Sequence, residues 1–438
     1  MLKPFGPPLA RPAESVTRPI RKRRGARLAQ CSGFIAYMAF SNGVILLFLT
    51  ACNLSTASVL FLLALPDLIQ FFLLVPGAFY ADRSGIKRLG LPGLALTVLG
   101  FAALPCSLFL EGTAAYLLIA GGVLLFGAGM ACFAAGWYAL LSPLVPQPER
   151  GRFFGRMRFW WQMVGLAFGG FCSLTLSDES SRGAFLAPLG VLTAGLVLRM
   201  LFYSRIPELD PPHRGTMGLR AALGESVRVE GYLSFCCYAF LLTLFTYTAP
   251  SLFALVLKKT LLYGDDDVIW MNNLLMLGSV LGFLLGGKAV DRLGTKSVFL
   301  SCHLGYGILF FLFLLRDLSP LPQFLHLGAV HFLFGLVAAS SSIAIATETL
   351  ALLPVGHKSM SASLNLTFLR GGQAVSGLII AWALKLGILS ESWSLFGASL
   401  GAYDSILLAC GVMVLLLALG TPCRCRGWRC LRRSATAG

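Results

Sequence analysis

Apolar and polar positions follow one another along this chain in long blocks instead of alternating residue by residue. Twelve apolar stretches of roughly 20 residues or more are separated by shorter polar segments. A helix of about 20 residues spans the hydrocarbon core of a bilayer, and the lack of strand-like alternation argues against a barrel. The pattern therefore predicts twelve transmembrane helices, at 31–52, 56–81, 90–110, 114–140, 158–177, 184–203, 232–257, 268–290, 297–315, 324–350, 361–386 and 400–419.

Composition agrees with this prediction. The chain of 438 residues is 57% hydrophobic and 12% charged, whereas a soluble domain carries about 25% charged residues. A soluble protein of this composition would expose large apolar patches. We therefore expect an all-α membrane protein.

The basic residues gather on one side of the predicted membrane topology. They lie before the first span, after spans 2, 4, 6, 8 and 10, and in the tail, and this cytoplasmic set includes Arg150, Arg152, Arg156 and Arg158. The opposite face holds few basic residues, one of which is Arg316, and it collects acids such as Asp404. This asymmetry places both termini in the cytoplasm, in a multi-pass protein of the cytoplasmic (inner) or plasma membrane. It also explains the net charge of +16 through contact with anionic lipid, without nucleic acid as a partner.

A short signature occurs twice. Asp82-Arg83-Ser84-Gly85-Ile86-Lys87-Arg88 returns 209 residues later as Asp291-Arg292-Leu293-Gly294-Thr295-Lys296. A second pair, Pro146 to Arg150 and Pro354 to Lys358, repeats at a spacing of 208 residues. Two motifs at nearly one spacing indicate two similar halves.

The repeats divide the chain into five segments. The polar, proline-containing stretch between spans 6 and 7 is the longest internal loop and is typical of a linker. We expect a basic cytoplasmic segment at 1–30, a six-helix bundle at 31–203, a cytoplasmic linker at 204–230, a second six-helix bundle at 231–420 and a basic cytoplasmic tail at 421–438.

With these residues, the chain resembles the major facilitator superfamily over essentially its whole length. The first signature departs from the family pattern in one place, since Ala78 stands where the family has glycine, whereas the second copy keeps Gly287. The resemblance implies two pseudo-symmetric six-helix bundles that rock around a central site.

The resemblance also implies that the signature loops act as a latch for one access state. A carboxylate at a helix end can accept hydrogen bonds from the N-terminus of a neighbouring helix, and glycine permits the tight turn that follows. The alternative is that these residues only anchor the topology. The candidate gating residues are Asp82, Arg83, Gly85, Lys87, Arg88, Arg150, Asp291, Arg292, Gly294 and Lys296.

Two ionisable residues lie deep inside predicted spans. Asp67 is 15 residues before Asp82, and Arg370 is 12 residues after Lys358, which places them about 22 and 18 Å along their helices. Such groups are costly in a membrane and are usually functional. The resemblance makes spans 2 and 11 neighbours, so Asp67 and Arg370 are predicted to form a gate pair, with Asp67 as the carrier of a coupling proton. Two alternatives stay open: a static pair, or Arg370 as the ligand of an anionic substrate group. Glu348 is predicted to be interfacial.

The resemblance implies a cavity lined mainly by spans 1, 4, 7 and 10, with additions from spans 5, 8 and 11. Polar and aromatic side chains there can bind a polar solute, although each residue alone can equally serve helix packing. The candidates are Tyr37, Asn42, Trp137, Tyr138, Gln162, Tyr238, Thr243, Tyr247, Asn272, Asn273, His331, Ser341, Asn365 and Gln373.

No arrangement of residues in the sequence suggests catalysis, a phosphate-binding loop, a cofactor or a metal. We therefore expect no enzyme, but a monomeric secondary active transporter of a small molecule, coupled to protons. A facilitative uniporter of the same fold is one alternative. A transporter-like receptor or regulator without flux is the other.

Overall fold

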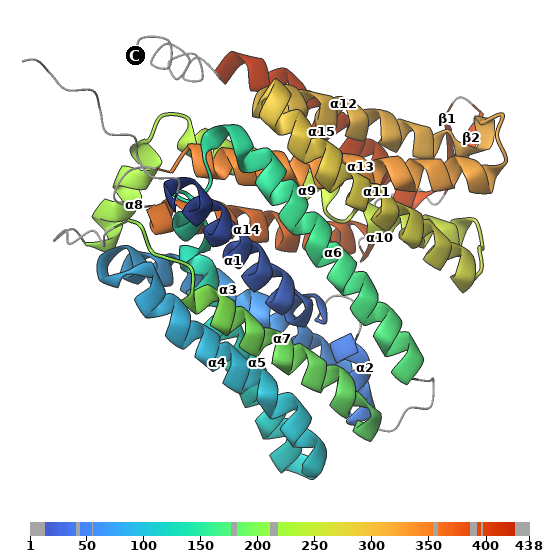
Figure 1. Cartoon of the computed structure of the whole chain (residues 1–438). Coiled ribbons are helices and arrows are strands. Elements are labelled where there is room, and N and C mark those ends of the chain that lie inside the picture. The colour runs from blue at the N-terminus through green and yellow to red at the C-terminus, as the bar shows by residue number, and fades with distance from the viewer. Residues whose placement is uncertain are drawn as a thin grey trace, which may run out of the picture.

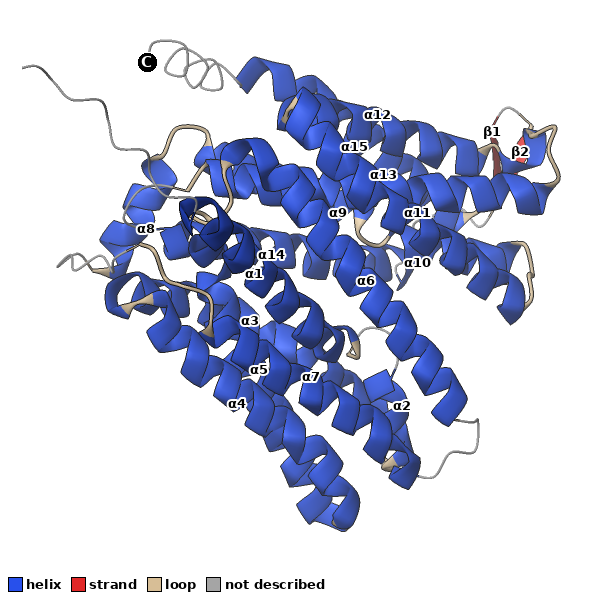
Figure 2. Cartoon of the chain, in the orientation of Figure 1, coloured by secondary structure: helices blue, strands red, loops and turns tan. Residues whose placement is uncertain are grey.

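Helices make up nearly all of the protein that the computed structural model describes, namely residues 14–40, 44–54, 56–176, 182–210, 218–353, 358–385, 392–395 and 397–424 (Figure 2). The helices of the first half are α1 (Glu14–Met38), α2 (Val44–Ala51), α3 (Thr56–Ser84), α4 (Ile86–Cys106), α5 (Gly112–Leu141), α6 (Arg150–Thr175) and α7 (Leu186–Ser204). One short helix, α8 (Leu219–Arg228), lies in the linker.

The second half repeats this arrangement. Its helices are α9 (Tyr232–Thr246), α10 (Ala249–Leu255), α11 (Asp265–Leu293), α12 (Thr295–Leu314), α13 (Gln323–Ala351), α14 (Lys358–Lys385) and α15 (Ala402–Arg424). Short helical turns occupy Ser107–Phe109, Gln147–Glu149, Arg182–Phe185, Val256–Thr260 and Arg316–Leu318. Strands β1 (Trp393–Leu395) and β2 (Ala398–Leu400) form an antiparallel hairpin before α15, in which Trp393 pairs with Leu400.

These helices confirm the predicted fold class of twelve spans in two six-helix bundles. Nine of the described helical segments are long and apolar enough to cross a membrane. The three remaining spans are formed by α1 with α2, by α6 and by α14. The seventh span also has two parts, since α9 ends at Thr246 and α10 continues from Ala249 into a π-helical turn that ends at Thr260.

The helices extend into the segments expected to flank the bundles. The helix that contains the first span begins at Glu14, inside the predicted basic segment 1–30. The helix that contains the last span continues to Arg424, inside the predicted tail. Within the linker, α8 packs on α9, α14 and α3. The linker therefore contacts both bundles.

Each bundle holds a buried arginine whose guanidinium has hydrogen-bond partners inside that bundle. In the first, Arg199 donates from Nε to the carbonyl of Ala29 (3.2 Å) and from Nη2 to Gln30 (3.3 Å). In the second, Arg316 makes a two-pronged ion pair with Asp404 (2.7 and 3.0 Å). Arg316 lies in the short turn after α12 and Asp404 in the first turn of α15, and both side chains are almost fully buried. The pairing offsets the cost of burying the two charges.

The two bundles meet along two seams. One brings α3 and α5 against α14, and the other brings α6 against α11 and α13. In Figure 1 the ribbons of the bundles lie closest at the end that carries α8 and diverge toward the end that carries α2 and the hairpin. We call the first the signature end, because both signature loops lie there, and the second the opposite end.

Candidate functional site

Asp82 and Asp291 each bind the N-terminus of a helix in the other half of the protein. The Asp82 carboxylate accepts hydrogen bonds from the backbone N–H groups of Ser359 and Met360, both at 2.9 Å, at the start of α14. The Asp291 carboxylate accepts from the N–H groups of Gly151 (2.7 Å) and Arg152 (2.9 Å), at the start of α6. These N–H groups have no partner within their own helices and sit at the positive end of the helix dipole.

The two caps are related by the sequence repeat. Asp291 lies 209 residues after Asp82, and the capped residues at the start of α14 lie 208 residues after those at the start of α6. Arg152 adds an ion pair at 3.0 Å to Asp291. The signature end is therefore closed by one carboxylate from each bundle.

A glycine stands directly before the helix that follows each of the two aspartates. Gly85 has φ of 110° and Gly294 has φ of 81°, directly before α4 and α12. These are backbone conformations that residues with a side chain rarely adopt. Glycine thus allows the chain to reverse within three residues of each capping aspartate.

The basic residues of the signatures have more varied surroundings. Arg83 lies over the ring of Phe79 at 4.4 Å, and Lys87 donates to the carbonyl of Ser204 at 2.7 Å. Arg150 donates from Nε to the carbonyl of Val145 at 3.3 Å. The side chains of Arg83, Arg88, Arg292 and Lys296 are exposed.

Two linker acids that sequence reasoning missed join the signature end. Glu208 accepts from the backbone N–H groups of Ile86 (2.6 Å) and Lys87 (3.2 Å), which begin α4. Asp210 pairs with the ammonium group of Lys358 at 2.6 Å, next to the backbone that Asp82 caps. Their only signal in the sequence is that they are acids in a basic loop. Glu348, which is expected to be interfacial, is buried and accepts a hydrogen bond from Thr295 of the second signature (2.7 Å).

Deeper along the first seam, the structure brings Asp67 and Arg370 together. Arg370 Nη1 lies 3.6 Å from Asp67 Oδ1, and the Tyr37 hydroxyl donates to the same oxygen at 2.5 Å. The guanidinium of Arg370 sits 5.3 Å from the centre of the Tyr37 ring and donates to Gln373 at 3.1 Å. Three spans from the two bundles, α1, α3 and α14, thus meet at one charged cluster.

Arg158 forms a corresponding contact on the second seam. The sequence pattern places it at the boundary between the basic residues after span 4 and the start of span 5, and in the structure it lies two turns inside α6. Its Nη1 atom donates to Ser342 of α13, and its guanidinium lies 6.0 Å from the ring of Phe283 of α11. Arg158 therefore reaches from the first bundle into the second.

Most of the remaining cavity candidates lie apart from one another, but Tyr138 interacts with Arg158 and Tyr247 with Arg370. Asn365 is buried and bonds Thr349 and Cys236, His331 packs on Phe253 in the core of the second bundle, and Tyr238 lies 3.3 Å from the His303 ring nitrogen. Trp137 and Ser341 are buried, Asn272, Asn273 and Tyr247 are exposed, and Tyr138, Gln162 and Thr243 are half-buried. Asn42 lies outside the described residues.

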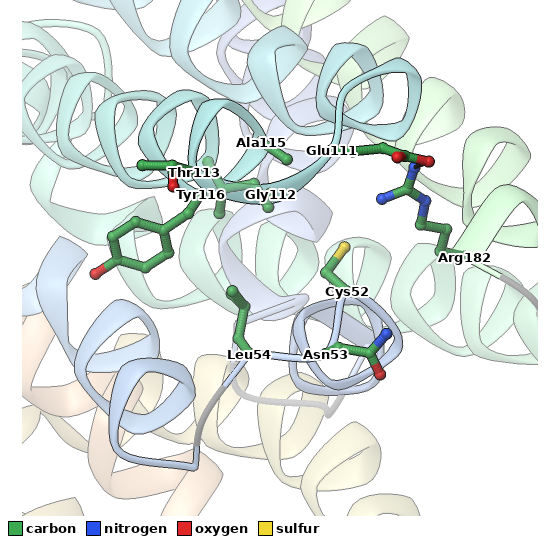
Figure 3. Close-up of a pocket in the computed structure, with 10 residues that line it drawn as sticks. Cys52, Asn53, Leu54, Glu111, Gly112, Thr113, Ala115, Tyr116 and Arg182 are labelled. Atoms are coloured by element: carbon green, nitrogen blue, oxygen red, sulfur yellow. Dashed lines mark ion pairs between the residues drawn. The ribbon is translucent and has the colours of Figure 1, made fainter.

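A pocket of about 730 Å³ lies at the opposite end of the first bundle. Figure 3 shows Glu111 and Arg182 pointing toward one another at its edge, where they form an ion pair of 3.8 Å. Its lining comes from the end of α2, the start of α5 and the turn before α7. The pocket therefore belongs to one bundle and lies apart from both seams.

Comparison with known proteins identifies the family to which this chain of two six-helix bundles belongs. A sequence model of the major facilitator superfamily matches residues 29–264, which is more than half of the chain. The chain belongs to the major facilitator superfamily. No curated protein matches its sequence.

Solved structures share the superfamily fold over nearly the whole chain. A bacterial homologue of the iron transporter ferroportin in an outward-facing state has a TM-score of 0.68 at 12% identity, covering 92% of this chain and 97% of that one. The Escherichia coli fucose:proton symporter has 0.65 at 13%, covering 90% and 98%. A human organic anion transporter has 0.63 at 15%, covering 93% and 99%.

At these identities the likeness concerns the fold alone. Together with the family match, it places this superfamily member among multi-pass membrane transporters and not among enzymes.

Proposed function

We propose that this protein is a secondary active transporter that moves a small solute by alternating access and is coupled to a proton gradient. The observation that carries the proposal is the pair of caps, Asp82 on α14 and Asp291 on α6. Each consists of hydrogen bonds between bundles, so it forms when the bundles are together at the signature end and breaks when they separate there. Such an element with two arrangements is what alternating access requires.

The orientation follows from charge. We assign the signature end to the cytoplasm, because the basic loops gather there, with both termini on the same side. The closed caps then correspond to a state open to the outside, in line with the outward-facing state of the ferroportin homologue.

Proton coupling is assigned to Asp67. Its side chain is 56% exposed, and its carboxylate contacts Arg370 across the seam and Tyr37 within its own bundle. Protonation would remove the charge that attracts Arg370, which ties the protonation of Asp67 to the distance between α3 and α14. The known proton symport by the fucose carrier of the same fold supports this assignment.

The test uses purified protein in proteoliposomes that contain a pH-sensitive dye, challenged with sugars, amino acids and organic acids. A coupled transporter moves protons when its solute is added and accumulates that solute under an imposed pH gradient. Equilibration without accumulation would instead favour a uniporter. Binding without any flux would favour a receptor.

A further inference from the structure

Two arginines from different bundles enter the region between the bundles from opposite seams. Arg158 of α6 contacts Ser342 and Phe283 of the second bundle, and Arg370 of α14 contacts Asp67 and Tyr37 of the first. Both lie within spans, where an arginine is costly unless it has a partner. The gating loops do not explain why these two arginines are placed within spans.

The charges around these arginines do not balance. Asp67 partly neutralises Arg370, but among the described residues no carboxylate lies within ion-pair distance of Arg158. In addition, the Nε atoms of both arginines are buried and have no hydrogen-bond partner in the described part of the chain. A guanidinium has five donors in a fixed fork that matches the oxygens of an acidic group. Of these two arginines with unused donors, only Arg370 has a carboxylate partner among the described residues.

A strip of aromatic rings connects the two arginines. The Arg158 guanidinium lies 5.7 Å from the ring of Trp161, which stacks on Phe34 at 3.9 Å and an angle of 7°. Phe34 lies 6.2 Å from Tyr37, whose ring is 5.3 Å from the Arg370 guanidinium. Helix α1 therefore supplies the two middle rings, Phe34 and Tyr37, of a row of aromatic contacts with a cation at each end.

From this arrangement we propose that the transported solute is an organic anion with an aromatic body. Its acidic group binds Arg158 or Arg370, and its ring packs on the strip formed by Phe34, Tyr37 and Trp161. Charge-assisted hydrogen bonds give the site its preference for an acid, and the rings add apolar contact. This inference rests on the proposed transport function and names its substrate class.

Asp67 competes with the anion in this site. When the site is empty, the Asp67 carboxylate is the counter-charge of Arg370. A bound acid takes over that role, so removal of the Asp67 charge should strengthen binding of the anion. Removal of either arginine should weaken it.

The test measures binding to the full-length protein in detergent by calorimetry. The probes are benzoate, 1-naphthoate and 1-naphthalenesulfonate, each beside its neutral amide or sulfonamide, with empty micelles as the blank. We expect the acids to bind at least about tenfold more tightly than their neutral partners, since a hydrogen bond to a charged group contributes about 1.5–3 kcal/mol.

Variants locate the binding. Arg158→Gln and Arg370→Gln should each lose about tenfold in affinity for the acids, and Asp67→Asn should gain several-fold. The matched control is Arg156→Gln, because Arg156 is exposed on the same helix, two residues before Arg158. If Arg158→Gln does not fold, Arg158→Lys keeps the charge but loses the fork, and should bind the acids more weakly than the wild type.

Three results would overturn the proposal. The first is that none of the three acids binds at concentrations up to about 10 mM. The second is that the neutral partners bind as tightly as the acids. The third is that Arg156→Gln loses as much affinity as Arg158→Gln. Uptake into proteoliposomes separates this proposal from the transport function. Binding of acids without uptake refutes transport but not the site, whereas uptake of neutral solutes alone refutes the site but not transport.

Discussion

Asp67 on α3 and Arg370 on α14 form an ion pair of 3.6 Å that joins the two bundles. A second pair in the same protein, Arg316 with Asp404, lies entirely within one bundle and is almost fully buried. The two pairs have the same chemistry but different surroundings. We therefore expect loss of the Arg316–Asp404 pair to lower mainly stability, and loss of the Asp67–Arg370 pair to impair mainly transport.

The first prediction compares Arg370→Gln with Arg316→Gln. The pair of Arg370 is partly exposed, so its loss should change the unfolding free energy by under about 1 kcal/mol. Loss of Arg316 leaves Asp404 buried without its partner and should cost about 3–5 kcal/mol. Thermal unfolding of the purified proteins measures both, and uptake driven by a pH gradient should be lost in Arg370→Gln. A large loss of stability in Arg370→Gln with intact coupling would show that its pair is only structural.

The second prediction concerns the caps of Asp82 and Asp291. Replacing either by Asn leaves one acceptor oxygen without charge, which should weaken the cap by about 1–2 kcal/mol. In Asp82→Asn, hydrogen exchange should rise at Ser359 and Met360, and in Asp291→Asn at Gly151 and Arg152. Exchange measured by mass spectrometry on peptides from α14 and α6 tests this. Each variant is the control for the other, and a uniform rise at both sites would argue against separate caps.

The third prediction concerns the glycine at which the two signatures differ. A Cβ atom at Gly287 would lie 2.6 Å from the carbonyl oxygen of Gly151, so α11 and α6 approach too closely for a side chain. The methyl group of Ala78, at the equivalent place, packs beside Ala135 and Leu366. We expect Gly287→Ala to open the second seam and to raise exchange at Gly151 and Arg152.

Ala78→Gly is the matched change on the first seam. It should cost only about 1 kcal/mol, the usual penalty for glycine within a helix, and should leave exchange at the start of α6 unchanged. Equal effects of the two substitutions would mean that the close approach at Gly287 is unimportant.

The fourth prediction separates the two linker acids. Glu208→Gln should increase hydrogen exchange at Ile86 and Lys87, because the charged cap of α4 is lost. Asp210→Asn should leave that region unchanged and weaken only the contact to Lys358. Because this pair is partly exposed, its contribution should be under about 1 kcal/mol and should fall as salt is added. An effect of Asp210→Asn at Ile86 would show that the two acids act as one unit.

Sequence reasoning predicted the cluster on the first seam only in part. The depth of Asp67 and Arg370 along their helices suggested a pair, and the structure brings the two together with Tyr37 and Gln373. It missed Arg158, because a basic residue near the start of an apolar stretch has the same pattern as a residue anchored at the membrane surface. Only the packing of α6 against α11 and α13 distinguishes the two cases.

The sequence by itself determined the membrane class, the twelve spans and the division into two halves, because these depend on composition and on repeats along the chain. It also identified the acids that end α3 and α11. The tertiary structure decided which helix each acid caps: Asp82 and Ser359 are 277 residues apart, and Gly151 and Asp291 are 140 apart. It also decided that the linker acids and Arg158 join the bundles. The local sequence pattern indicates whether a residue is compatible with lipid or with water. Which residue becomes its partner depends on how helices from distant parts of the chain pack together.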